Sequence, residues 1–156
     1  MTISAIVQHL PALLIAAPLF FAFLTPMAGY AGRALRTLWV ALGITATSSI
    51  GLALAWKVFT TGTVLYVFGA AGIDQTMPPD SGGMPIRIIF EVDAFCALMI
   101  VIASVVAFAA TIYSLASEAE CTGQDGFYAL FFLLIVGVMG MVSTGDLFNF
   151  FIFLEI

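Results

Sequence analysis

Charged side chains are scarce in this sequence. Four Lys or Arg and nine Asp or Glu make up only 8% of the 156 residues, whereas a soluble domain carries about 25% charged residues. Hydrophobic residues make up 63% of the chain, and the mean hydropathy is +1.19. Such a composition predicts an integral membrane protein, whose helices are held by close packing and by backbone groups satisfied within each helix.

Bases, cysteines and the usual ligands of cofactors are also few. A net charge of −5 leaves no basic patch for nucleic acid. Cys96 and Cys121 have no repeated spacing, so we expect neither a structural disulfide nor a metal site. No glycine-rich phosphate loop follows a strand, and no Ser/His/Asp set is evident. We therefore expect no metal and no cofactor in this chain, and whether it serves an enzyme complex stays open.

Long apolar runs predict four transmembrane helices. They extend over residues 5–24, 38–59, 94–115 and 127–142, which is close to the length needed to cross a hydrocarbon core about 30 Å thick. A shorter apolar segment, Leu147–Glu155, is predicted to be the first half of a fifth helix. The expected fold is an all-α integral membrane protein in which residues 1–156 form a single transmembrane domain.

The first connection suggests an orientation. Residues 25–33 are rich in turn-forming residues, and Arg33 and Arg36 lie at the end of this connection. By the positive-inside tendency this side faces the cytoplasm, which puts the N-terminus outside. Lys57 and Arg87 then fall on the outer side, so the bases alone do not decide the orientation.

The long polar segment over residues 60–87 is not a span. It contains turn signals around a short apolar run. We predict a small external β-hairpin made of residues 64–68 and 86–90.

Small residues recur at helical spacing on two of the predicted spans, which predicts faces where another helix approaches closely. These positions are Gly43, Thr47, Gly51 and Ala55 on the second span, and Ala103, Ala107 and Thr111 on the third.

Four polar residues near the span ends have both a structural and an ionic interpretation. Lys57 is predicted to extend its ammonium to the interface, and His9 is predicted to be interfacial. Glu91 and Asp93 are predicted to be solvated residues at the boundary of the third span. The alternative for each is a supporting role in an ion pathway.

The last stretch carries one isolated carboxylate among aromatic and aliphatic side chains. Thr144 or Asp146 is expected to cap the fifth helix. Glu155 then lies roughly 13 Å along the helix from Asp146, near the middle of the membrane if Asp146 marks its boundary. Because burying a carboxylate there is costly, Glu155 is a functional candidate by default.

Three pieces of the chain resemble a known family. They are Gly72-Ile73 with Ile89-Phe90-Glu91-Val92-Asp93-Ala94, then Phe127-Tyr128-Ala129-Leu130, and finally the stretch from Thr144 to Ile156, which reads TGDLFNFFIFLEI. Residues 66–156 resemble the antiporter-like proton-translocating membrane subunits. That family includes the antiporter-like subunits of respiratory complex I, the membrane arms of energy-converting hydrogenases and Mrp-type sodium/proton antiporters. The third piece looks most like the Mrp D subunit and its hydrogenase counterpart.

The resemblance implies a role for Glu155 as the intramembrane proton-carrying group. In the family this glutamate pairs with a lysine on a later span, and no later span is present in this sequence. The resemblance also implies that the transported ions are protons, with sodium as a further candidate. The expected partners are other membrane subunits of the same complex and the lipid bilayer, and the expected location is the cell membrane.

Two other interpretations stay open. The chain is alternatively a structural membrane subunit, or a non-functional truncated copy, with no transport of its own; a membrane-embedded enzyme is disfavoured. Because the fifth helix would end at mid-membrane, we expect the chain to be the N-terminal part of a longer subunit with many more spans. Alone, it is expected to assemble poorly and to conduct no protons.

Overall fold

The computed structural model describes residues 9–68, 88–117 and 124–156. In this part of the chain, four long helices carry most of the residues: α2 (Leu10–Tyr30), α3 (Arg33–Thr61), α4 (Ala94–Ser117) and α5 (Gln124–Ser143). Each is long and apolar enough to cross a membrane. A short helix, α6 (Leu147–Glu155), follows, and two strands, β1 (Val64–Val67) and β2 (Ile89–Val92), complete the described elements. The predicted all-α, multi-span membrane protein is confirmed.

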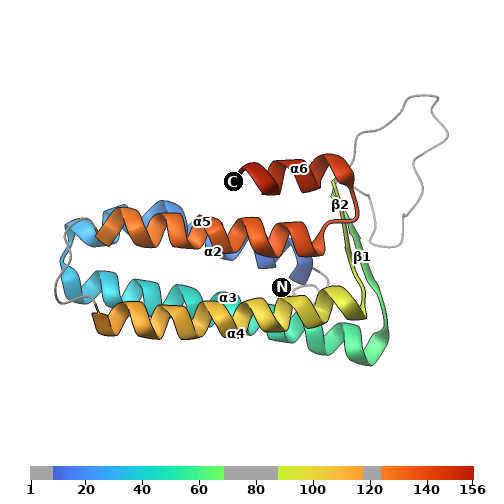
Figure 1. Cartoon of the computed structure of the whole chain (residues 1–156), viewed down its shortest axis with the longest axis horizontal. Coiled ribbons are helices and arrows are strands. Elements are labelled where there is room, and N and C mark those ends of the chain that lie inside the picture. Colours follow the sequence, from blue (N-terminus) through green and yellow to red (C-terminus); the bar gives the residue numbers. More distant parts are fainter. Residues whose placement is uncertain (1–8, 69–87, 118–123) are drawn as a thin grey trace.

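The long helices form two layers (Figure 1). Helices α2 and α5 pack together in one layer, and α3 and α4 pack together in the other. Helix α6 lies on the outer side of α5. The end of α4 and the start of α5 lie at the same end of the bundle as the α2–α3 turn, whereas the strands and the α5–α6 turn share the other end.

Large apolar side chains fill the space between the layers. Leu14 of α2, Leu54 of α3, Ile100 of α4, and Tyr128 and Phe132 of α5 are almost completely buried in one continuous cluster. Each long helix therefore contributes to a single core.

The small-residue positions on α3 are buried, as predicted. A Cβ added at Gly43 would lie 2.5 Å from Cζ of Phe132, and one added at Gly51 would lie 2.8 Å from Oγ of Ser104. Gly43 therefore leaves room for the Phe132 ring of α5, and Gly51 leaves room for the Ser104 side chain of α4. On α4, Thr111 is buried, while Ala103 and Ala107 pack against the core.

The predicted loop over residues 25–33 is wrong. Helix α2 continues through Pro26 to Tyr30, and the chain reverses within Ala31 and Gly32. Gly32 has a φ of +127°, a conformation that side-chain-bearing residues rarely adopt.

Proline disturbs a helix because it lacks an N–H donor and crowds the preceding turn. Here the adjoining turn has extra hydrogen bonds. The Thr25 hydroxyl donates to the Phe21 carbonyl at 2.6 Å, and the Trp39 indole of α3 donates to the same oxygen at 3.4 Å. Turn-forming composition alone did not reveal this support.

The predicted hairpin is right in its first strand and misplaced in its second. Strand β2 begins at Ile89 and excludes Ile88, while the predicted positions 86 and 87 lie outside the described residues. It pairs antiparallel with β1, so that Tyr66 lies opposite Phe90. Phe90 and Val92 are buried and Glu91 between them is exposed, which is the period-two pattern of a half-covered strand. Glu91 therefore lies in the sheet with its side chain exposed.

Candidate functional site

The site is built around helix α6, which rests in a notch on α5. A Cβ added at Gly137 would lie 3.0 Å from the Phe153 carbonyl oxygen. A Cβ added at Gly140 would lie 2.5 Å from Cε1 of Phe153 and closer still to Cγ and Cδ1. The two glycines, one helical turn apart, therefore admit the backbone and the ring of α6. Phe153 is buried there and packs against Val136.

Asp146 caps α6, as predicted. Its carboxylate accepts a hydrogen bond of 3.1 Å from the Phe148 backbone N–H. The other predicted candidate, Thr144, has a different role, because its hydroxyl accepts hydrogen bonds from the Asn149 side-chain amide at 3.2 Å and the Asp146 backbone N–H at 3.3 Å. Asn149 is 3% exposed, so α6 carries one satisfied polar group on the face toward the protein.

The sheet fixes the start of α6. Thr144 forms an isolated antiparallel bridge with Phe90, and the Gly145 N–H donates to the Ile89 carbonyl at 3.0 Å. Gly145 lies close to the Glu91 side chain, since an added Cβ would be 3.0 Å from Cβ of Glu91. The turn into α6 therefore acts as a third, very short strand beside β2.

Glu155 lies at the far end of α6 and faces away from α5. It comes two residues after Phe153, about 200° around the helix from that buried ring. Its side chain is exposed, as are the apolar side chains one turn earlier, Phe151 and Ile152. Within the described residues, the Glu155 carboxylate has no hydrogen bond or ion pair. Its surroundings must therefore come from lipid or from groups outside the described residues.

The other predicted site residues do not gather around Glu155. Asp93 precedes α4 and accepts a 2.7 Å hydrogen bond from the Cys96 backbone N–H. This bond lowers the pKa of the Asp93 carboxyl below its ordinary value. Lys57 is half-buried near the end of α3, on the other side of the α2/α5 layer from α6. Asp93, Asp146 and Lys57 all lie toward the strand-bearing end of the bundle.

Two polar contacts at this end were not predicted from the sequence. One is the Asn149–Thr144 hydrogen bond. The other joins Nδ1 of His9, at the start of α2, to the Tyr66 hydroxyl of β1 at 3.0 Å. This contact gives His9 a partner in the sheet. The described residues contain no group of three or more His, Cys, Asp or Glu side chains placed to hold a metal ion.

Comparison with known proteins supplies the family. No model of a protein family matches the chain. The chain is 36% identical to a probable K(+)/H(+) antiporter D subunit of Rhizobium meliloti, over 71% of this chain and 21% of that protein. It is 33% identical to the N subunit of the NADH-quinone oxidoreductase of Desulforudis audaxviator, over 95% of this chain and 28% of that protein. The chain belongs to the antiporter-like family of membrane subunits.

A solved structure has a similar fold. A chain of the membrane-bound sulfane sulfur reductase, an archaeal respiratory membrane complex, matches 93% of this chain with a TM-score of 0.72 and 30% identity. The match covers 28% of that chain. The part of each relative that this antiporter-like chain matches is thus only 21–28% of that relative's length.

Proposed function

We propose that this antiporter-like chain contributes to proton translocation in a multi-subunit membrane complex, with Glu155 as the intramembrane proton carrier. The observation that carries the proposal is the position of Glu155 at the far end of α6. That helix is capped by Asp146, the turn that leads into it is hydrogen-bonded to β2, and it packs in the glycine notch of α5. Three independent constraints thus fix a helix whose last polar group faces outward among apolar side chains.

The chemistry needs only a change in the electrostatic surroundings of the carboxyl group. A low-dielectric environment favours the neutral acid, whereas a nearby ammonium favours the carboxylate. If a cationic side chain approaches Glu155 and then retreats, the carboxyl group releases a proton and later takes one up. The outward orientation of Glu155 leaves room for such a cation on a neighbouring helix.

The names of the relatives support transport of ions. Two of them are the D subunits of a K(+)/H(+) and a Na(+)/H(+) antiporter, the second from Bacillus subtilis. We infer that protons are moved, and that sodium or potassium is a candidate counter-ion. Partners would be other membrane subunits, in the cell membrane, with the N-terminus and the strands outside.

The test is proton transport by the intact complex that contains this chain, carrying Glu155→Gln. In inverted membrane vesicles, we expect the change in internal pH that added sodium or potassium produces to be lost, while the variant complex assembles in normal amounts. Glu91→Gln is the matched control, because that carboxylate is exposed on β2 at the end of the bundle. It should leave transport near the unsubstituted level.

Unchanged transport in Glu155→Gln would favour the second candidate function, a structural subunit. The glycine contacts on α3 and α5 are equally compatible with that role. The identity of the copurifying subunits would then show whether the chain belongs to an antiporter complex or to a hydrogenase or NADH-quinone oxidoreductase complex.

A further inference from the structure

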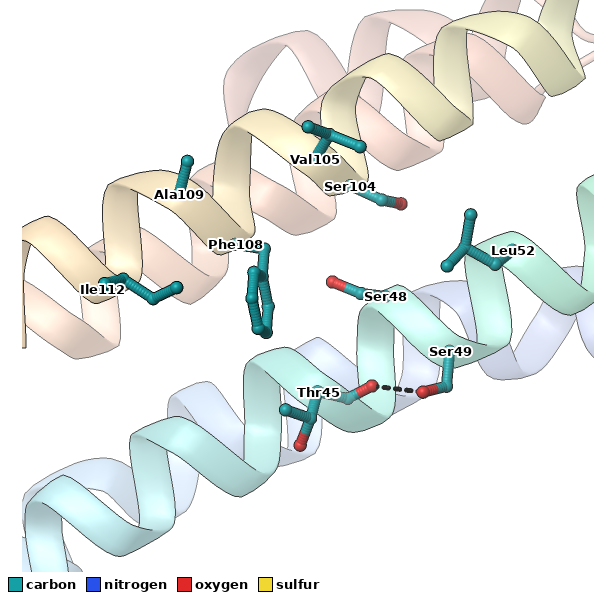
Figure 2. A pocket seen from close by; sticks show the side chains of 9 residues that line it. All are labelled: Thr45, Ser48, Ser49, Leu52, Ser104, Val105, Phe108, Ala109 and Ile112. Carbon is teal, nitrogen blue, oxygen red and sulfur yellow. Dashed lines mark hydrogen bonds between the residues drawn. The ribbon is translucent and has the colours of Figure 1, made fainter.

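A second polar feature lies far from Glu155, in a groove between α3 and α4 (Figure 2). The groove has a volume of about 390 Å³ and is open on its outer side. Its walls are mostly apolar, with Leu52 of α3 and Val105 and Phe108 of α4 among them. Its floor carries the hydroxyl groups of Ser48 and Ser104, both of which point into the space between the helices.

Neither floor hydroxyl has a hydrogen-bond partner among the described residues. Ser48 is 9% exposed and Ser104 is 2% exposed. Buried hydroxyls normally find a partner, because leaving one unsatisfied costs about 1–3 kcal/mol. Both serines lie near the midpoints of their helices, where a membrane offers no water to replace that partner.

Neighbouring hydroxyls behave differently. Thr45 and Ser49 line the same groove, and each donates to a carbonyl one turn earlier in α3: Thr45 to the Ala41 oxygen at 2.8 Å and Ser49 to the Thr45 oxygen at 2.6 Å. Such back-bonding is the ordinary solution for a helical serine in lipid. Ser48 and Ser104 are instead oriented toward the groove.

The dimensions and walls of the groove indicate what fills it. Water occupies about 30 Å³ per molecule and needs two to four polar partners. A groove of this volume would take many waters, and the two free hydroxyls can bind few of them. A lipid tail would cover the walls and leave both hydroxyls unsatisfied. A transmembrane helix with one polar side chain would both cover the apolar walls and give the two hydroxyls a hydrogen-bond partner. Small and hydroxyl-bearing residues are typical of such helix contacts in membranes.

We propose that this groove seats a transmembrane helix from outside the chain, which places a hydroxyl or carboxamide side chain between Ser48 and Ser104. Such a side chain both donates and accepts, so it can satisfy the two serines together. The match covers only 21–28% of the three relatives compared above, so most of each relative lies outside the part that this chain matches. Further helices that can fill the groove are therefore available in such assemblies.

The first experiment identifies the occupant by photo-crosslinking in the intact complex. A benzophenone amino acid replaces Phe108, an aromatic residue on the groove wall, and in a parallel variant it replaces Tyr113, which lies about 140° around α4 from Phe108. From position 108 we expect a crosslinked peptide of a transmembrane helix carrying Ser, Thr, Asn or Gln, and a much weaker yield of that peptide from position 113. Lipid adducts alone at position 108 would overturn the proposal.

The second experiment tests the hydrogen bonds. Interhelical hydrogen bonds in membranes contribute modestly to stability. Ser48→Ala and Ser104→Ala should therefore each lower the apparent association constant of the complex, measured by detergent titration, by roughly threefold. Ser49→Ala is the matched control, since its hydroxyl is already bonded within α3, and it should change nothing. If the apparent association constants of Ser48→Ala and Ser104→Ala equal that of Ser49→Ala, the two serines do not bind the neighbouring helix and the proposal fails.

Discussion

The notch on α5 gives the sharpest structural prediction, through the substitution Gly140→Ala. The added methyl group would lie 2.5 Å from Cε1 of Phe153 and closer to two other ring carbons, whereas carbon atoms prefer about 3.5–4.0 Å. The ring must therefore retreat by about 1 Å or more, and part of the clash is at its base, which moves only with the backbone of α6. Overpacking of this kind typically costs about 1–3 kcal/mol.

Gly126→Ala on the same helix provides the control. A Cβ at Gly126 meets nothing within 4 Å, so this variant retains the general effect of replacing glycine in a helix without the clash. The difference in unfolding free energy between the two variants, measured by denaturant titration in detergent micelles, should be about 1–3 kcal/mol. Hydrogen exchange of the α6 amides should rise only in Gly140→Ala.

A double variant tests whether the ring is the cause. Phe153→Ala removes the clashing atoms, so Gly140→Ala with Phe153→Ala should be less destabilised than the sum of the single variants. If Gly140→Ala matches Gly126→Ala in stability and in α6 exchange, the notch does not hold α6 and our account of how Glu155 is positioned is wrong.

Three further predictions concern helix ends and orientation. Asp146→Ala should cost about 1 kcal/mol in unfolding free energy and Asp146→Asn much less, because asparagine also caps helices. The Cys96 amide lowers the folded-state pKa of Asp93, so Asp93→Ala should reduce the thermal unfolding midpoint at neutral pH. This difference in midpoint should disappear as the pH falls through the lowered pKa, and a difference that grows in acid would contradict a lowered pKa. Single cysteines at Ser81 and Ser117, in a background without native cysteines, should react with an impermeant label in intact cells at Ser81 only; the reverse result would invert the topology.

Hydropathy predicted the number and type of the helices because it depends on the sum of many side chains. It placed the starts of α4 and α6 correctly, yet it ended α2 too early. Pro26 and the residues after it are typical of a loop, and the hydrogen bonds to the Phe21 carbonyl that accompany the continued helix come partly from Trp39, on another helix. Contacts between distant elements are not visible in local composition.

The candidate site was only partly predictable for the same reason. An isolated carboxylate in an apolar stretch identified Glu155, and cap chemistry identified Asp146. The buried role of Asn149 depends on Thr144 and on the pairing of that turn with β2, which no local pattern indicates. The spacing of Gly137 and Gly140 is a usable local signal for a close helix contact.

The most direct test of the central claim is the protonation state of Glu155 during transport. Infrared difference spectra of the intact complex, recorded as transport is triggered, should contain a carboxyl band that changes with turnover. We predict that this band is absent in Glu155→Gln, retained in Glu91→Gln, and shifted when Glu155 is isotopically labelled. A spectrum with the same carboxyl changes in Glu155→Gln, accompanied by normal proton flux, would contradict the role of Glu155 as the proton carrier.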